Sequence, residues 1–328
     1  MRSQEIGLLL LLVLILSPAI PAAAHVPGLA GEGVVVVPDV EKSYAWYGVL
    51  DSPDDYDRYI LNADAGMVLI LATSSPDPGA APPFALIGPG IGTRDPLLPR
   101  DIPVGDGYGS IMIPLPVGVQ PPSYEPFTPM AIYEGGDFSY SVSTPGDYTV
   151  VVHGGEGRYI LATGYREEFS VAEWLLIPVS VLSIRIWQGQ SLFLVLLPII
   201  GAVIAGGYWF RHHCRETGRR VWPGAWLIVT AGFAYAGSGI LVIAQMIGAG
   251  LATGPVPSML LTLIFAAIPI ALGVLLVRVA VHAGPAPTLA GRGLLIVLAI
   301  LGFISWAGLI VGPVLVLAAA IVPGNEKE

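Results

Sequence analysis

Long apolar segments in the second half of the chain restrict its fold more than any other feature. These segments contain no Asp, Glu or Lys, and their one arginine, Arg278, stands near the end of the third. A bilayer core about 30 Å thick is crossed by a helix of about 20 apolar residues, and backbone polar groups in lipid must be bonded internally. We therefore expect a bundle of about four transmembrane helices, over residues 191–210, 225–247, 258–281 and 293–322.

The last of these segments is about 30 residues long, which is more than a bilayer requires. One tilted helix, kinked at Gly312-Pro313, would accommodate the extra length, and a re-entrant hairpin is the alternative. Small residues recur in the segments, for example Gly232, Gly239 and the spacing Gly308-x-x-x-Gly312. They predict close packing of helices within one chain, or a seam in a homo-oligomer.

Residues 1–24 have the parts of a cleavable signal peptide. Arg2 precedes an apolar core from Ile6 to Leu16, and small residues end at Ala24. The apolar core of about 11 residues is too short to span a bilayer as a helix. Cleavage after Ala24 would make His25 the mature N-terminus, and a retained anchor is the alternative.

The charge distribution predicts the orientation in the membrane. Residues 25–170 contain 19 acidic and 6 basic residues, whereas residues 171–328 contain 4 and 8. Four arginines between 211 and 220 place that loop in the cytoplasm by the positive-inside rule. We expect a multi-pass protein of the plasma membrane, with its N-terminal domain and the tail 323–328 outside the cytoplasm. The acidic domain is poorly suited to bind nucleic acid.

Residues 25–170 predict an all-β sandwich or jelly roll, because short β-type runs alternate with Gly, Pro and Asp. The only cysteine is Cys214, so this domain must fold without disulfides. The turn Gly154–Gly157 predicts a hairpin between 148–152 and 159–162, and residues 75–129 predict long ordered loops. The expected strands are 44–50, 57–62, 67–73, 84–87, 110–113, 138–143, 147–153 and 158–163.

Two motifs in this domain resemble a known family. Gly48-Val49-Leu50-Asp51 leads into Asp55-Tyr56-Asp57-Arg58-Tyr59, and Thr144-Pro145-Gly146-Asp147-Tyr148 precedes a second strand. Both resemble the pre-peptidase C-terminal type of β-sandwich. The order of this domain and a small helical membrane unit is similar to that of an uncharacterised, mainly archaeal family of membrane proteins. The resemblance implies an architecture and no activity.

Residues 171–190 join the two parts and predict an interfacial segment. Trp174 and Trp187 flank an apolar stretch that contains Pro178 and Arg185. This stretch is too short to cross the membrane, and indole rings favour the headgroup level. We expect the segment to connect the β-domain to the bilayer surface.

Three groups of residues could bind metal, each with a plainer explanation. A free α-amine and imidazole on His25 could chelate copper, with His153 as a further ligand, although an ordinary exposed terminus is the simpler explanation. The dense carboxylates could bind calcium, but a turn also explains them. The adjacent His212, His213 and Cys214 lack the spacing of a zinc site. The carboxylates are Asp51, Asp54, Asp55 and Asp57.

The sequence contains no catalytic pattern, and its apolar segments lack the midplane charges of ion-coupled transporters. We therefore expect a binding module without intrinsic catalysis, anchored in the bilayer, that contacts an envelope or membrane protein. One alternative is an extracytoplasmic copper- or calcium-binding protein, and another is an accessory subunit of a transporter or membrane enzyme.

Overall fold

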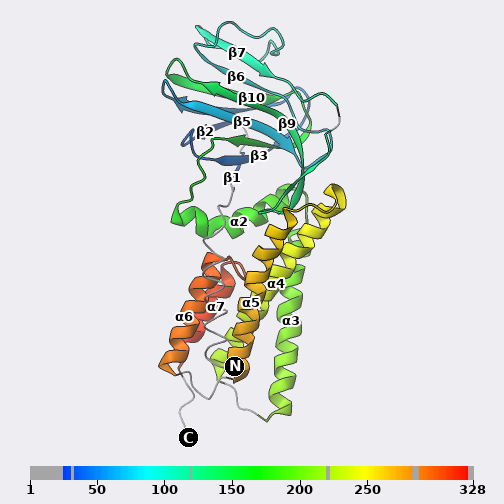
Figure 1. Ribbon diagram of the computed structural model, residues 1–328, viewed down its shortest axis with the longest axis vertical. Helices are drawn as coiled ribbons and strands as arrows, with labels where there is room; N and C mark the ends of the chain where they lie inside the picture. The colour runs from blue at the N-terminus through cyan, green and yellow to red at the C-terminus, as the bar shows by residue number, and fades with distance from the viewer. Residues whose placement is uncertain (1–24, 31–32, 119, 219–221, 283–287, 324–328) are drawn as a thin grey trace.

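A computed structural model describes residues 25–30, 33–118, 120–218, 222–282 and 288–323. A β-rich domain of two sheets occupies residues 26–163 and is followed by helices, three of them long and apolar enough to span a membrane. Helix α2 (Val171–Trp187) lies across the junction between the two parts (Figure 1). The predicted signal peptide and the end of the predicted tail, 324–328, lie outside the described residues.

The β-domain is a sandwich of a six-stranded and a five-stranded sheet, which we call sheet A and sheet B. Sheet A has the order β1-β3-β11-β5-β9-β8, and sheet B has the order β2-β4-β10-β6-β7. The strands of sheet A are β1 (Val26–Leu29), β3 (Tyr44–Leu50), β11 (Gly157–Thr163), β5 (Val68–Ser75), β9 (Met130–Ser141) and β8 (Ser123–Glu125). Those of sheet B are β2 (Val34–Val37), β4 (Tyr56–Ala63), β10 (Gly146–His153), β6 (Phe84–Pro89) and β7 (Tyr108–Ile113).

The core between the sheets is formed by side chains that alternate along the strands, as the period of two requires. Tyr59, Tyr148 and Tyr159 are fully buried there. The hydroxyl groups of Tyr59 and Tyr159 are 2.7 Å apart, so these polar groups are paired inside an apolar core. All eight predicted strands are present. Short strands β1, β2 and β8 were not predicted, and β9 begins earlier than expected.

The predicted hairpin around Gly154–Gly157 is wrong. Strand β10 pairs with β4 and β6 in sheet B, whereas β11 pairs with β3 and β5 in sheet A. The turn therefore carries the chain from one sheet to the other. Positive φ angles at Gly154 and Gly157 permit this turn, and Val150 and Leu161 then face the same core from opposite sheets.

Both outer faces of the sandwich are covered in part. The loop that follows β6 packs Leu98 and Ile102 against Ala85 and Val151 of sheet B, which confirms the prediction of ordered loops in this region. On sheet A, Ile184 of α2 packs against Tyr47 and Ile160. Sheet A thus faces the helices, and sheet B faces away from them (Figure 1).

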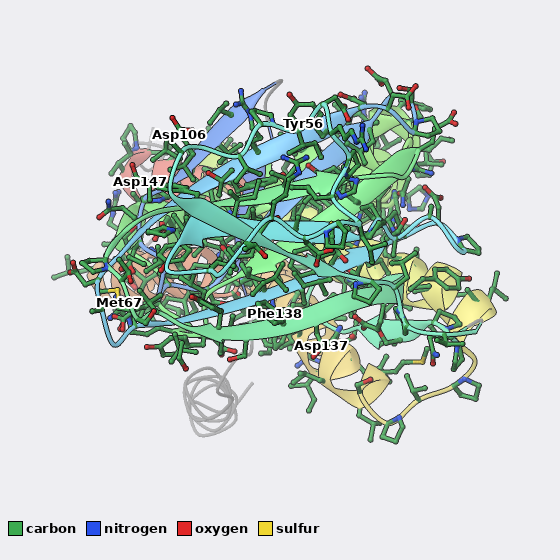
Figure 2. The ribbon with its side chains drawn as sticks, turned by 90° about the horizontal axis from the view of Figure 1, so that it is seen from above. Tyr56, Met67, Asp106, Asp137, Phe138 and Asp147 are labelled. Carbon is green, nitrogen blue, oxygen red and sulfur yellow. The ribbon has the colours of Figure 1, made fainter. Side chains whose placement is uncertain are left out.

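The candidate spans are α3 (Leu192–Glu216), α4 (Pro223–Thr253) and α5 (Met259–His282). Helix α4 has 31 residues, which corresponds to a length of about 46 Å, well above the thickness of a bilayer core. The C-terminal end of α4 and the N-terminal end of α5 extend beside β8 and β9. In Figure 2, viewed from the β-domain end, they emerge on the side where Asp137 is labelled. A hydroxyl–hydroxyl bond of 2.8 Å joins Thr262 of α5 to Tyr124 of β8.

Residues 293–322 form a helical hairpin instead of one tilted helix. Helix α6 (Leu289–Ile304) and helix α7 (Val311–Ile321) lie side by side. The chain reverses because Trp306, Gly308 and Leu309 all have positive φ angles, which end α6. Both helices are shorter than a bilayer requires.

The hairpin changes the predicted position of the C-terminal segment. The guanidinium of Arg292, at the start of α6, donates to the carbonyls of Ala320 and Val322. Trp222, at the start of α4, donates to the carbonyl of Pro323 at 2.8 Å. Pro323 therefore lies at the end of the helical part that is far from the β-domain, and not beside that domain as a fourth span would place it.

Small residues pack the helices of this one chain, as predicted. A Cβ on Gly239 would approach the carbonyl of Ala266 in α5 to 2.5 Å, and one on Gly232 would approach the carbonyl of Gly273 to 2.9 Å. Gly312 lies equally close to Tyr235. Close approach of α4 to α5 and to the hairpin thus depends on glycine at these positions, because any side chain there would clash.

Candidate ligand cavity between the β-domain and the helices

A cavity of about 640 Å³ lies at the junction of the two parts. Its volume lies within the range of about 300–1,000 Å³ typical of ligand pockets. The outer face of sheet A forms one wall, and helices α2, α4 and α5 with the tip of the α6–α7 hairpin form the others. We call this space the junction cavity. Each part of the chain supplies only some of its walls.

The helical walls of the junction cavity are largely apolar. Helix α2 contributes Ile177 and Val181, helix α4 contributes Leu241 and Val242, and helix α5 contributes Phe265. Helices α4 and α5 are among the segments long and apolar enough to span a membrane. This wall can therefore hold a hydrocarbon chain without exposing it to water.

The wall on the β-domain side is more polar. Glu125 and Ser123 come from β8, Glu134 from β9 and Ser74 from β5. The Ser123 hydroxyl donates to the Glu134 carboxylate at 2.6 Å. The cavity thus has an apolar side and a polar side, which is the arrangement that an amphiphilic molecule requires.

The tip of the hairpin closes one end of the cavity. Trp306 packs at a tilt against Trp174 of α2 with ring centroids 4.4 Å apart, and its indole N–H donates to the Trp174 carbonyl at 2.9 Å. The hydroxyl of Ser238 in α4 accepts from the N–H of Gly308 at 2.9 Å. Positive φ angles at Trp306 and Leu309 cost energy, and such strain often occurs at ligand sites.

Arg185 is the buried cation of the junction cavity. It is 3% exposed, and its Nη1 donates to the Pro129 carbonyl at 3.0 Å and to the Gln188 side chain at 2.9 Å. No carboxylate among the described residues forms an ion pair with it. Burial lowers the pKa of Arg185 to about 10, so the side chain remains charged at neutral pH.

Helix α2, which carries Arg185, is fixed firmly to the β-domain. Ser170 and Glu173 form a capping box at its start, and Lys42 forms an ion pair with Glu173 at 2.7 Å. At its other end the indole N–H of Trp187 donates to the Gly48 carbonyl at 3.0 Å. The position of Arg185 relative to sheet A is therefore set at both ends of the helix.

Glu125 is a half-buried carboxyl on the polar wall. Burial raises its pKa above the ordinary 4.5, although the N–H of Phe127, which donates to it at 3.0 Å, acts in the opposite direction. A carboxyl whose pKa is higher in the folded than in the unfolded protein stabilises the fold below its unfolded pKa. That contribution is lost as the pH rises through the folded pKa.

We expect Glu125→Gln to raise the melting temperature of the protein at pH 8, with a gain that shrinks as the pH falls towards 4. The amide removes the buried charge but still accepts the bond from Phe127. Thermal unfolding in detergent from pH 4 to pH 8 measures this difference. Glu156→Gln, in the exposed turn after β10, is the control and should show no such trend. An equal gain at every pH would contradict a raised pKa of Glu125 in the folded protein.

His25 and His153 lie in different places. His25 is exposed at the edge of the junction cavity, where its Nδ1 bonds to the hydroxyl of Ser43. His153 is buried at the end of β10 in sheet B, 3.4 Å from the sulfur of Met112. The proposed copper pair therefore comprises one residue next to sheet A and one in sheet B.

The carboxylates of residues 51–57 are used locally. Asp55 accepts from the backbone N–H groups of Asp51 and Tyr56, which is the pattern of a turn. Asp57 accepts from the buried hydroxyl of Tyr159. Asp54 is exposed. Within the described part of the chain, no three His, Cys, Asp or Glu side chains come together as a metal site.

Sequence reasoning missed the junction cavity and the place of Arg185 in it. The signal for Arg185 was present, because a single arginine interrupts the apolar segment between Trp174 and Trp187. An intramembrane or interfacial charge is a functional candidate by default. The cavity itself arises between segments that are far apart in the sequence, such as β3, α2 and α5, and no local pattern shows that they meet.

No protein-family model and no curated protein match the sequence. Among solved structures, the chain is similar to PliG of Aeromonas hydrophila, a periplasmic inhibitor of g-type lysozyme. The identity is 14%, the match covers 43% of this chain and 99% of that chain, and the TM-score is 0.25. A likeness this low supports no functional argument. The resemblance to pre-peptidase C-terminal domains and to a mainly archaeal family stays a prediction.

Proposed function

We propose that the chain is a membrane-anchored binding protein without intrinsic catalysis, and that its junction cavity holds an amphiphilic molecule taken from the bilayer. The observation that carries the proposal is the composition of the cavity walls. Apolar side chains of α2, α4 and α5 supply most of the apolar side, whereas Arg185 of α2 and the polar side chains of sheet A supply the polar side. The boundary between the two sides lies where the chain passes from membrane helices to the β-domain.

The distribution of arginines supports an extracytoplasmic β-domain. Arg211 and Arg215 at the end of α3, Arg278 near the end of α5 and Arg292 at the start of α6 all belong to the end of the helical part far from the β-domain (Figure 1). The loop 254–258 at the near end carries no charge. By the positive-inside rule the far end is cytoplasmic. The junction cavity would then lie at the outer leaflet.

Photo-crosslinking tests the proposed function. The full chain in maltoside micelles is incubated with an uncharged fatty alcohol that carries a photoactivatable group in its chain, and the modified residues are mapped. We expect crosslinks in the cavity walls, at Val181, Leu241 or Phe265. Phe193 and Ile204 of α3, which are exposed on the apolar surface, serve as the comparison for general contact with lipid. Crosslinks on α3 with none in the cavity would contradict the proposal.

Ligand binding is better supported than the metal-binding alternative. The two histidines belong to different parts of the β-domain, and the carboxylates near Asp55 serve a turn and a buried tyrosine. The junction cavity, in contrast, combines volume, an apolar wall and a buried cation in one place.

A further inference from the structure

We infer that the amphiphile in the junction cavity has an acidic head group, a phosphate or a carboxylate, and that Arg185 and Tyr47 bind it. This inference rests on the proposed function and adds the chemical class of the ligand. It is carried by two buried donor side chains that line the cavity and retain hydrogen-bonding capacity there.

Arg185 retains donors that the protein does not use. A guanidinium has five N–H donors, and both bonds that the described residues provide to Arg185 use Nη1. Burying a cation is costly unless an anion or several acceptors compensate it. The Nε and Nη2 donors form the fork that binds carboxylate or phosphate with two parallel bonds. A ligand anion in the cavity would therefore supply the partner that the folded chain lacks.

Tyr47 is the second donor. Its side chain, on the outer face of β3, is 8% exposed and lines the same cavity as Arg185. Its ring packs edge-on against Trp187 with centroids 5.0 Å apart, and none of the described residues accepts a hydrogen bond from its hydroxyl. Burial raises the pKa of Tyr47, so the hydroxyl stays protonated and able to donate.

These two donors line the same part of the junction cavity, because residues on either side of Arg185 contact Tyr47. Ile184 packs against the Tyr47 side chain, and the ring of Trp187 meets its ring edge-on. By contrast, the hydroxyl of Tyr124, which also lines the cavity, is already bonded to Thr262. Tyr47 and Arg185 thus provide three free donor atoms, the Nε and Nη2 of Arg185 and the hydroxyl oxygen of Tyr47, which match the several acceptor oxygens of an acidic head group.

The acidic residues of the cavity already have partners or lie near its exposed edge. Glu125 accepts from the N–H of Phe127, and Glu134 accepts from Ser123. Glu167 is exposed and lies near His25. Salt screens the repulsion of an anion by Glu134 and Glu167, which are exposed. Glu125 also acts on Tyr47, but burial raises the pKa of this carboxyl and so favours its neutral form. The buried position of Arg185 and Tyr47 is where an acidic head would be bound most strongly.

A head-group series with a constant chain tests the inference. Dodecyl phosphate, dodecanol and dodecyltrimethylammonium compete with the uncharged photoactivatable alcohol for crosslinking to the cavity of the full chain. We expect dodecyl phosphate to compete at least about tenfold more strongly than the other two, because hydrogen bonds to charged groups are the strong ones. Equal competition by all three, or strongest competition by the cation, would overturn the inference but leave the proposed function intact. No competition by any probe would overturn both.

Two variants locate the effect. Tyr47→Phe removes one hydroxyl from the site, and Arg185→Gln removes the charge and leaves a shorter polar side chain. We expect each to weaken binding of dodecyl phosphate about tenfold and to leave dodecanol unchanged. The matched control is Arg158→Gln, because Arg158 donates to the carbonyl of Gln188 but does not line the cavity. If Tyr47→Phe folds normally and binds dodecyl phosphate as tightly as the wild type, Tyr47 is not part of the site.

Discussion

Gly302→Ala is expected to destabilise the protein by about 2–3 kcal/mol, through the loss of the packing between the α6–α7 hairpin and α4. A Cβ at Gly302 would overlap the hydroxyl of Tyr235 and lie 3.0 Å from Pro313 of α7. Tyr235 is fully buried, and its hydroxyl is 3.4 Å from the carbonyl of Leu298, so the ring has little space to move. Inserting atoms into such a core typically costs about 1–3 kcal/mol.

The control for this variant lies in the same helix. A Cβ at Gly293 would meet no atom within 4 Å, so Gly293→Ala should be neutral or slightly stabilising, since alanine favours the helix by up to about 1 kcal/mol. Thermal unfolding of both variants in detergent measures the difference. Equal melting temperatures would show that the hairpin does not pack on Tyr235 as described.

Val242→Trp is expected to reduce binding of the photoactivatable alcohol more than tenfold. Val242 belongs to the apolar wall of the junction cavity, and an indole there would occupy the space that a hydrocarbon chain needs. Binding depends on the apolar surface that the chain buries, at about 0.8 kcal/mol for each CH₂ group. Loss of even a few of these groups from the cavity is therefore sufficient for the expected effect.

Ile240→Trp controls for the added indole. Ile240 lies on the same helix, is 47% exposed and is not part of the cavity. Crosslinking of both variants by the same probe should decrease only for Val242→Trp. A similar decrease for both would indicate that the substitution acts through α4 as a whole, and undiminished binding by Val242→Trp would place the ligand elsewhere.

Much of the architecture follows from local patterns. Strand 44–50 is an apolar run rich in aromatic residues that ends at the turn residues Asp51-Ser52-Pro53, so its bounds were predicted as the structure has them. The three longest helices were predicted because an apolar segment of that length has few other solutions. The segment with Trp174 and Trp187 was predicted as a connection between the two parts, and it forms α2 at that place.

The errors concern features that depend on distant contacts. The turn at Gly154–Gly157 is compatible with a hairpin and with a crossing between sheets. Which of the two forms depends on the strands that flank β10 and β11, namely β4, β6, β3 and β5. The hairpin of α6 and α7 requires positive φ at Trp306 and Leu309. Bulky residues rarely adopt this conformation, and packing against Trp174 and Ser238 compensates for it here.

The candidate site was the least predictable part for the same reason. Arg185 and Tyr47 are separated by more than a hundred residues in the sequence and meet because α2 packs on the outer face of sheet A. Neither residue stands in a motif. Conversely, His25 and the carboxylates near Asp55 attracted notice through local density, which the structure explains by an exposed chain segment and a turn.

The most direct test of the account is the native mass of the full chain, extracted gently from its own membrane and released from the micelle. The account predicts a mass that exceeds that of the polypeptide by one amphiphile, and that the same extraction of Val242→Trp yields the bare polypeptide while Ile240→Trp retains the ligand. A wild-type mass without any bound molecule, or the same bound mass in Val242→Trp as in the wild type, would contradict the claim that the junction cavity is a ligand site.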